Sequence, residues 1–475
     1  MPSDKLLLIR KGQPMTLRQQ LQLTLQLSLP AILAQISTIV MEYIDASMVG
    51  HLGANQSAAI GLVSSSIWLF AGLCSCVISG FSVQVAQLIG ADNISKARSV
   101  LRQSISSVLI FCIIMVIIGS SISQALPGWL GGNDAIAKDA SSYFLIFILS
   151  LPAYGVVYLA GSMLRCSGNM KIPSILNVLM CGLDIVFNAL LIFPSRFYHV
   201  LGYKVFVPGG DLGVTGAALG STIAVVITAI LMMGYLLLRS PELKLSKEKG
   251  GFMPQEDCLK RAFRIGLPMS CEHFVMCAAQ IVSTIIVAPL GIISIAANSF
   301  AITAESLCYM PGFGISDAAT TLVGQCVGGG RQQLAQRFAN ITVILGMAVM
   351  TLMGIIMYIA APLMMSIMTS NVEIQSLGVT VLRIEAFAEP MFAASIVSYG
   401  VFVGAGDTLI PSIMNLGSMW AVRLTIAAIL APILGLKGVW IAMCIELCFR
   451  GAIFLFRLIF RKSGYFSRQI ATANS

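Results

Sequence analysis

Residues 341–362 read ITVILGMAVMTLMGIIMYIAAP, a run without a single charged side chain. An α-helix rises about 1.5 Å per residue, so a run of this length can cross the roughly 30 Å hydrocarbon core of a membrane. Residues 108–119 and 225–238 are also uncharged and lie in apolar windows of similar length. Hydrophobic residues make up 57% of the 475 and charged residues 10%, a composition outside the range of water-soluble domains. We therefore predict an integral membrane protein.

The membrane spans are predicted to be helices. Inside lipid, every backbone N–H and C=O group needs an internal partner, which leaves either helices or a closed β-barrel. The strands of a membrane barrel alternate apolar and polar residues over about ten positions. The apolar runs of this sequence do not alternate, so the predicted fold class is all-α.

Polar breaks divide the sequence into twelve predicted spans. They lie near 26–50, 58–89, 103–126, 140–164, 173–194, 215–238, 264–289, 297–327, 338–368, 377–402, 411–434 and 438–461. The predicted organisation is an amino-terminal cytoplasmic and interfacial segment (1–25), an N-lobe (26–238), a cytoplasmic linker (239–263), a C-lobe (264–461) and a cytoplasmic tail (462–475).

Basic residues are distributed unequally between the two sets of connecting loops. The loops predicted on the side of the termini contain Lys96, Arg98, Arg102, Arg165, Lys171, seven basic residues between Arg239 and Arg264, Arg331 and Arg337. The opposite loops contain Lys138, Arg196, Lys204 and Lys437. The positive-inside rule therefore predicts a multi-pass protein of the inner (plasma) membrane with both termini in the cytoplasm. This topology explains the net charge of +9, and no nucleic-acid partner is expected.

The two halves of the chain repeat with an offset of 238 residues. Corresponding positions hold the same residue at Pro30 and Pro268, Gln87 and Gln325, Gly90 and Gly328, Pro152 and Pro390, Gly168 and Gly406, and Asn177 and Asn415. The string IPSI occurs at 172–175 and again at 410–413. Because six is an even number of spans, both halves start on the same side of the membrane, which makes the repeat parallel. Two lobes with a cleft between them are typical of transporters.

Several motifs give the sequence a specific resemblance. They are DASMVGHLG at 45–53, Leu-Pro at 29–30 and 267–268, APLG at 288–291, GAGDT at 404–408 followed by Pro411, and the segments around Gln87 and Gln325. With these motifs, in this order and on twelve spans, the chain resembles the multidrug and toxic compound extrusion (MATE) transporters. The resemblance implies a V-shaped, two-lobed antiporter that expels cationic or amphipathic compounds in exchange for protons or sodium.

A nucleotide-driven mechanism is not expected. The glycine-rich segment at 328–331 is not followed by the GK[ST] of a phosphate-binding loop, so the energy must come from an ion gradient or a partner subunit. The coupling ion, H⁺ or Na⁺, takes the place of a cofactor. The expected partners are the lipid bilayer and small cationic or amphipathic substrates, and we expect a monomer.

Two aspartates of the N-lobe are candidates for coupling ion movement to transport. Ionisable groups at membrane depth cost several kcal/mol unless they are paired or neutralised. Asp45 lies fifteen residues after Pro30, a proline that would allow the first span to bend. Asn177, Asp184 and Asn188 are spaced to share one face of the fifth span. An aspartate on such a sheltered face holds a proton more readily than one in water.

Each aspartate also has a simpler interpretation. Asp45 could be a solvated carboxylate at the end of its span, and Asp184 could make a helix–helix hydrogen bond. In the branch of the family that couples protons through the amino-terminal lobe, the fifth span carries Asn and then Asp four residues later. Here Asp184 comes first and Asn188 second, so the transfer of the proton role to Asp184 stays open.

Glu272 is the main C-lobe candidate. It follows Pro268 by four residues and resembles the glutamate that the family uses for cation or substrate exchange. Its position in the first repeat is Ala34, so the architecture does not require an acid there, and a role at the entry of the helix is the alternative. The sodium-linked branch usually adds an aspartate on the tenth span, where this chain has Phe392.

Further ionisable residues in the C-lobe spans are predicted to support the site. Arg423 is expected to take Glu305, Glu385 or Glu389 as its partner, either as part of ion coupling or as a structural ion pair. Glu389 precedes Pro390, a proline that frees a carbonyl group able to help hold a cation. Glu446 and Arg450, four residues apart, are interpreted as a local pair without a transport role.

The lining of the cleft is expected to be aromatic and flexible. The candidates are Tyr43, Trp68, Tyr154, Tyr309 and Met310. The twelve cysteines and three histidines are scattered, so neither a metal site nor a catalytic residue is predicted.

Two other functions are compatible with parts of the pattern. A flippase of lipid-linked sugars would share the two-lobed fold, but such proteins usually have further spans or cationic residues along the cleft, whereas the charges inside these spans are mainly acidic. A membrane-embedded enzyme would need a nucleophile with a base or a metal pair, and His273 beside Glu272 is the sole candidate for such a pair.

Overall fold

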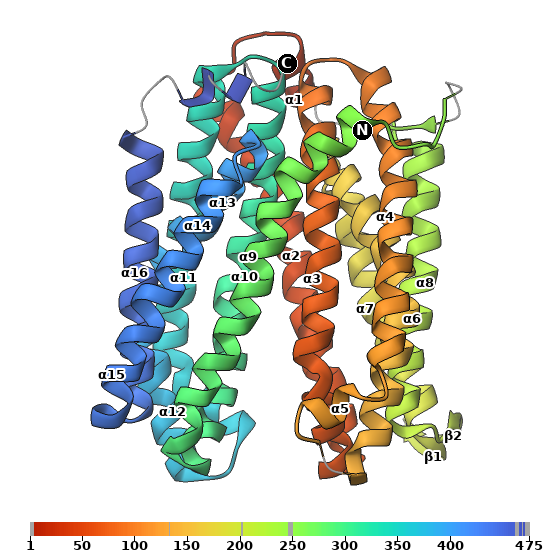
Figure 1. Ribbon diagram of the computed structural model, residues 1–475, viewed down its shortest axis with the longest axis vertical. Coiled ribbons are helices and arrows are strands. Elements are labelled where there is room, and N and C mark those ends of the chain that lie inside the picture. Colours follow the sequence, from red (N-terminus) through yellow and green to blue (C-terminus); the bar gives the residue numbers. More distant parts are fainter. Residues whose placement is uncertain are drawn as a thin grey trace.

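The computed structural model describes residues 4–132, 134–200, 203–245, 250–460, 465–467 and 469–470. Long helices stand side by side in a bundle (Figure 1). The N-lobe consists of α2 (Leu17–Gly50), α3 (Ala54–Gly90), α4 (Ile94–Ile122), α6 (Asp134–Cys166), α7 (Lys171–Ile192) and α8 (Gly213–Arg239). The C-lobe consists of α9 (Glu256–Val287), α10 (Ile292–Gly328), α11 (Gln332–Met368), α12 (Val372–Glu385), α13 (Glu389–Ala405), α14 (Leu409–Gly417), η3 (Ser418–Leu424), α15 (Thr425–Leu434) and α16 (Leu436–Phe460).

Short elements complete the fold. They are α1 (Asp4–Arg10), α5 (Leu126–Trp129), η2 (Ala288–Leu290) and an antiparallel hairpin of β1 (Pro194–Val200) and β2 (Tyr203–Gly210). The sequence pattern does not predict this hairpin, which lies between the fifth and sixth spans. Apart from this hairpin, the described chain confirms the all-α prediction: it has eleven helices long and apolar enough to span a membrane, or twelve with the bent pair α12 and α13 counted as one.

Side-chain caps fix several helix starts. Before α2, the Thr16 backbone N–H donates to Gln19 Oε1 at 2.9 Å and the Gln19 N–H donates to Thr16 Oγ1 at 3.3 Å, a reciprocal capping box. Asn371 accepts from Glu373 N–H at 2.9 Å at the start of α12. At these two starts, polar residues in the breaks of the sequence thus satisfy some of the N–H groups that a helix start leaves free.

The predicted tenth span, 377–402, is bent. It is divided into α12 and α13, which meet at an angle of 58°. The physical reason is Pro390, which lacks an N–H and whose ring would clash with the carbonyl group of Ala386 in a straight helix. The predicted eleventh span, 411–434, is also irregular, because residues 418–424 form a π-helix between α14 and α15.

The backbone of the two lobes preserves the sequence repeat. Gly168 and Gly406, which correspond in the repeat, have φ angles of 87° and 86°, the left-handed region that favours glycine. Helix α2 of the N-lobe packs against α10 of the C-lobe, and α3 packs against α9. Since α2 corresponds to α9 and α3 to α10, these two contacts are related by the repeat.

The lobes approach most closely at two corresponding glycines. A Cβ atom at Gly90 would stand 2.0 Å from the carbonyl oxygen of Gln325, and one at Gly328 would stand 1.8 Å from that of Gln87. Because Gln87 and Gln325 also correspond in the repeat, α3 and α10 cross backbone to backbone at one symmetric point.

The described terminal segments lie at this same end of the bundle (Figure 1). Arg331, in the turn between α10 and α11, donates to the carbonyl oxygens of Leu8 at 3.2 Å and Gln13 at 2.8 Å. Ser467 donates to Gln332 at 2.9 Å. Leu8 and Gln13 near the amino terminus and Ser467 near the carboxy terminus therefore meet at one turn of the C-lobe.

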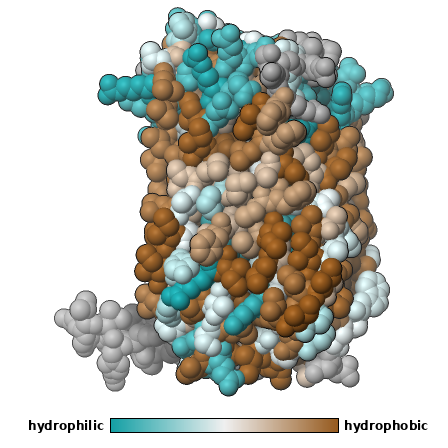
Figure 2. All heavy atoms as spheres, turned by 90° about the vertical axis from the view of Figure 1, so that its left-hand side faces the viewer, coloured by the Kyte–Doolittle hydropathy of each residue, from teal (hydrophilic) through white to brown (hydrophobic). Residues whose placement is uncertain are grey.

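Each lobe has its own apolar core, and apolar side chains also cover the outside. The N-lobe core contains Phe81, Phe144 and Met163, and a C-lobe core contains Met357, Met365 and Trp440. Figure 2, which views the C-lobe side, shows a broad hydrophobic belt with a hydrophilic cap at the end of the described termini. This belt is the surface expected to contact lipid.

The glycine crossing generates a stability prediction. Gly90→Ala and Gly328→Ala should each lower the free energy of unfolding by about 1–3 kcal/mol, because a methyl group would push two backbones apart. The measurement is thermal unfolding of the purified protein in detergent. Gly61→Ala is the control, since Gly61 lies on α3 with no atom within 4 Å of the added Cβ. Equal midpoints for all three variants would contradict the close crossing.

Candidate functional site

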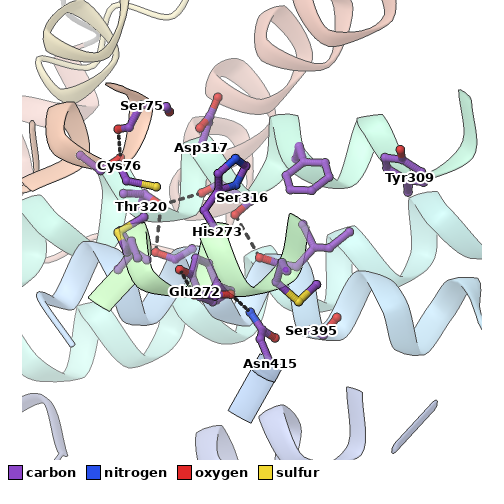
Figure 3. Close-up of a pocket in the computed structure, with 18 of the residues that line it drawn as sticks. Ser75, Cys76, Glu272, His273, Tyr309, Ser316, Asp317, Thr320, Ser395 and Asn415 are labelled. Carbon is purple, nitrogen blue, oxygen red and sulfur yellow. Dashed lines mark hydrogen bonds between the residues drawn. The ribbon is translucent and has the colours of Figure 1, made fainter. Parts of the chain in front are cut away.

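A cavity of about 730 Å³ lies between the lobes. Figure 3 shows Ser75 and Cys76 of the N-lobe across from Glu272, His273, Tyr309 and Asp317 of the C-lobe. Of the predicted lining residues, Trp68, Tyr309 and Met310 contact the cavity. Tyr43 and Tyr154 lie outside its lining; Tyr154 packs instead against Phe147 inside the N-lobe, with ring centroids 5.2 Å apart.

Glu272 is positioned by two neutral donors from other helices of its lobe. Tyr399 of α13 donates its hydroxyl to Glu272 Oε2 at 2.7 Å, and Asn415 of α14 donates its amide to Oε1 at 2.6 Å (Figure 3). Glu272 is buried from bulk water yet lines the cavity. The carboxylate is therefore held in a fixed place where it can meet a ligand.

The sequence neighbour of Glu272 also faces the cavity. His273 Nε2 lies 3.2 Å from the carbonyl oxygen of Trp68 on α3. A Cβ atom at Gly72 would stand 1.8 Å from the same nitrogen. His273 thus contacts the backbone of the opposite lobe, and its ring makes no hydrogen bond to Glu272 in the described chain.

Asp45 and Asp184 meet around a single amide in the N-lobe. Asn188 Nδ2 donates to Asp45 Oδ1 at 2.9 Å and to Asp184 Oδ2 at 3.1 Å. The two carboxylates are therefore no more than about 6 Å apart, in a medium where like charges repel strongly. Asp184 and Asn188 are almost fully buried, and Asp45 is half-buried. Such a pair is stabilised by a shared proton or a bound cation.

A close approach of α8 holds this amide in place. A Cβ atom at Gly220 would stand 2.1 Å from Asn188 Oδ1, and that oxygen is buried without a hydrogen-bond donor in the described structure. Asn188 therefore directs its donor toward the aspartates and leaves an acceptor free beside them.

The other two N-lobe candidates lie apart from this pair. Asn177 is half-buried on α7, and no described hydrogen bond joins it to Asp184 or Asn188. Pro30 lies inside α2, which runs as one helix from Leu17 to Gly50. Of the three polar residues expected to share one face of α7, Asp184 and Asn188 are hydrogen-bonded to each other, and Asn177 has no described bond to either.

The two lobes place their carboxylates at different depths. Asn415, which binds Glu272, corresponds to Asn177 in the repeat, and Glu272 corresponds to Ala34. Asp45 lies eleven residues beyond Ala34 on α2, about 16 Å along a helix. The N-lobe pair is consequently nearer the end opposite the described termini than Glu272 is.

The C-lobe contains a second group of carboxylates. Glu305, Glu385 and Glu389 are almost fully buried, and both oxygens of Glu385 and of Glu389 have no hydrogen-bond partner among the described residues. The nearby carboxylates of Arg423, which is carried by the π-helical segment, are Glu446, Glu305 and Glu385. No described carboxylate lies within 4.0 Å of its guanidinium nitrogens, so the expected direct ion pair does not form.

Three arginines reach the cavity; the sequence predicts a role in the site for Arg423 but not for Arg165 or Arg450. Arg165, Arg423 and Arg450 line it together with Glu272, Glu305 and Asp317. Arg165 Nε lies 3.7 Å from Asp317 Oδ2 across the lobes, and Arg450 pairs with Glu446 at 2.6 Å, as the spacing on α16 predicted. Glu272, Glu305 and Arg423 remain as the charges without an ion pair in the described lining.

The inter-lobe pair was missed although the sequence contained a signal for it. Asp317 lies well inside the predicted span 297–327, where an ionisable residue is costly. Arg165 directly follows the predicted span 140–164. Nothing in the sequence indicated that the two would face each other, because the pairing depends on how the lobes pack.

Comparison with known proteins agrees with this architecture. The MatE family model matches residues 30–190 and 268–429, which is more than half of the chain. The chain belongs to the MATE family. The two matched blocks start 238 residues apart, the same offset as the internal repeat.

Curated relatives match this MATE chain over almost its whole length. A probable multidrug resistance protein NorM from Thermotoga maritima is 25% identical and covers 94% of this chain and 93% of its own. The corresponding protein from Idiomarina loihiensis is 27% identical, with 90% and 92% covered. Members of this family are transporters, so the chain is a membrane transporter rather than an enzyme.

Solved structures share the fold. A MOP superfamily transporter from Pyrococcus furiosus superposes with a TM-score of 0.86 at 19% identity over the full length of both chains. A mutant of the Vibrio cholerae MATE transporter VcmN superposes with a TM-score of 0.85 at 16% identity, with 96% of this chain and 99% of that chain covered.

The GAGDT motif of this MATE chain has a structural role at the end of the bundle where the described termini lie. Asp407 forms an ion pair with Arg457 of α16 and accepts a hydrogen bond from the Tyr465 hydroxyl at 2.8 Å. The Arg457 guanidinium also stacks 4.6 Å from the centre of the Phe402 ring. The motif therefore fixes the segment after α16 to the start of α14.

Two equally buried glutamates of the MATE fold should respond differently to neutralisation. Glu446→Gln removes the partner of the buried Arg450, and breaking such a pair costs about 3–5 kcal/mol. Glu385→Gln should cost far less, because Gln matches the shape of a protonated Glu and no described cation lies within ion-pairing distance. Chemical or thermal unfolding in detergent measures both. A similar loss in both variants would show that Glu385 is held as a charged partner.

Proposed function

We propose that this MATE transporter is a secondary antiporter that exports cationic or amphipathic compounds in exchange for protons or sodium. The observation that carries the proposal is the placement of carboxylates: Glu272 faces the cavity between the lobes, while Asp45 and Asp184 form a sheltered pair in the N-lobe. The positive-inside pattern supports an inner-membrane orientation with both termini in the cytoplasm.

The cavity suits amphipathic cargo. Tyr309 packs edge-on against Phe392 and Phe313, with ring centroids 5.6 and 6.0 Å apart, which gives an aromatic wall. Met276 and Met310 also line the cavity, and methionine side chains adapt to ligands of different shape. Aromatic faces attract cations, so this wall and Glu272 favour the same class of ligand.

Ion movement and substrate export are coupled because the ion and the cationic substrate compete for the same buried negative charges. Asp45 and Asp184 repel each other when both are ionised, so the pair favours uptake of a positive ion. A cationic substrate near Glu272 would disfavour a second cation in the same lobe. The inward and outward states would then alternate as each lobe loads or releases its positive charge.

The buried C-lobe glutamates support a further contribution to coupling. Glu385 and Glu389 have four carboxyl oxygens without described hydrogen-bond partners, and they lie on either side of the bend between α12 and α13. A bend in a span is where a change in protonation can alter helix geometry. We propose that Glu305, Glu385, Glu389 and Arg423 adjust the C-lobe response to the ion.

A flippase of anionic lipid-linked sugars is the second candidate. Arg165, Arg423 and Arg450 at the cavity are the observation in its favour. Two of these arginines are already paired, to Asp317 and Glu446. The unpaired charges of the described lining are therefore mainly acidic, which favours cationic cargo.

The experiment compares Asp45→Asn, Asp184→Asn and Glu272→Gln in inverted vesicles that carry a pH-sensitive dye. For the unmodified chain, an ethidium-like cation or sodium should dissipate an imposed proton gradient. Loss in both aspartate variants with Glu272→Gln spared would assign proton coupling to the N-lobe, and the reverse would assign coupling to the C-lobe.

The control is Asp139→Asn, a change in an acid near the start of α6 that has no role in the proposed site. If no cation dissipates the gradient in the unmodified protein and lipid-linked sugar is transported instead, antiport of cations is wrong.

A further inference from the structure

Arg383 stands on the outer, lipid-facing side of the C-lobe rather than in the cavity between the lobes. It lines a separate groove of about 460 Å³ formed by α11, α12 and α16. The other lining residues are mainly apolar, among them Ile384, Phe387 and Ile445. Phe387 is 71% exposed, and Figure 2 shows hydrophilic atoms within the lower part of the hydrophobic belt on this side.

A proline explains how the guanidinium is anchored. Pro362 has no N–H, so the carbonyl group of Tyr358, four residues earlier on α11, lacks its helical partner. Arg383 Nε donates to this oxygen at 3.3 Å. The guanidinium also stacks 5.1 Å from the centre of the Tyr358 ring, and Phe387 packs edge-on against that ring with centroids 5.9 Å apart.

This anchoring leaves the two terminal nitrogens of the Arg383 guanidinium available to a ligand. Nε donates to the Tyr358 carbonyl oxygen, while no described hydrogen bond involves the terminal nitrogens, which carry four N–H donors. No described carboxylate lies within ion-pairing distance. A planar fork of this kind matches the oxygens of a phosphate group.

The depth of the groove indicates which membrane region faces it. Arg383 lies eleven residues after the start of α12, about 16 Å from that helix end. The 37-residue helix α11 is about 55 Å long, which exceeds a hydrocarbon core of roughly 30 Å. Arg383 thus lies near the edge of the core in the leaflet opposite the described termini, and Phe387 lies one turn nearer the centre.

We propose that this groove binds an anionic phospholipid of that leaflet. The Arg383 terminal nitrogens hold the phosphate, and an acyl chain runs along Phe387 and Ile445 toward the membrane centre. Charge complementarity identifies the head group, and the apolar lining identifies the chain. The proposal does not depend on the coupling ion or on the cargo.

Native mass spectrometry of the full chain in detergent tests the site. The delipidated protein is titrated with dioleoyl phosphatidylglycerol and, separately, with dioleoyl phosphatidylcholine. The unmodified chain should prefer phosphatidylglycerol. In Arg383→Gln this preference should fall about fivefold, the effect of one basic residue near an anionic lipid surface. Arg383→Lys should lie between the two, because Lys keeps the charge but lacks the fork.

Two further variants distinguish lipid binding in this groove from nonspecific attraction of anionic lipids to basic residues. Lys437→Gln, at an exposed basic residue near the start of α16, should leave the preference unchanged. Phe387→Ala should lower the binding affinity for both lipids equally, because the two lipids have the same acyl chains. The proposal is overturned if Arg383→Gln binds phosphatidylglycerol like the unmodified chain, or if Lys437→Gln causes the same loss as Arg383→Gln. It is also overturned if glycerophosphoglycerol, which has no acyl chains, displaces the lipid, because the groove would then be a site for a soluble anion.

Discussion

A charged carboxylate in a low-dielectric interior must be compensated, and this constraint organises the candidate site. The N-lobe meets it with one amide shared by Asp45 and Asp184. The C-lobe meets it for Glu272 with a tyrosine hydroxyl and a second amide. In both lobes the compensating groups are neutral donors rather than arginines. Neutral donors position an acid without cancelling its charge, so the acid keeps its attraction for a positive ion.

The repeat shows how one scaffold supports two different sites. Asn177 and Asn415 correspond, yet Asn415 binds an acid and Asn177 does not, because the position matching Glu272 holds Ala34. The N-lobe instead builds its acid pair farther along the same helices. The two halves therefore share the helix packing and the glycines of the crossing but differ in which layer of the bundle carries the charge.

The sequence was sufficient for the parts of the fold that depend on local chemistry. Apolar runs located the twelve spans, and the 238-residue offset revealed the lobes. The bend at 386–388 was not recognised, although Pro390 was visible. Contacts between distant segments could not be predicted from the sequence. Asn188 donates to Asp45, 143 residues earlier in the chain. Arg165 lies beside Asp317 only because of how the lobes pack. The unused arginine donors at Arg383 likewise required a view of the neighbouring helix.

The crossing at Gly90 and Gly328 limits how the halves of the molecule can move. Two backbones that touch without an intervening side chain can turn about the point of contact. Sliding by one residue would bring the bulkier Ile89 or Val327 against the facing carbonyl. A tilt of the lobes about this crossing would displace the far end of the bundle, about the length of a helix away, much more than it displaces the crossing itself.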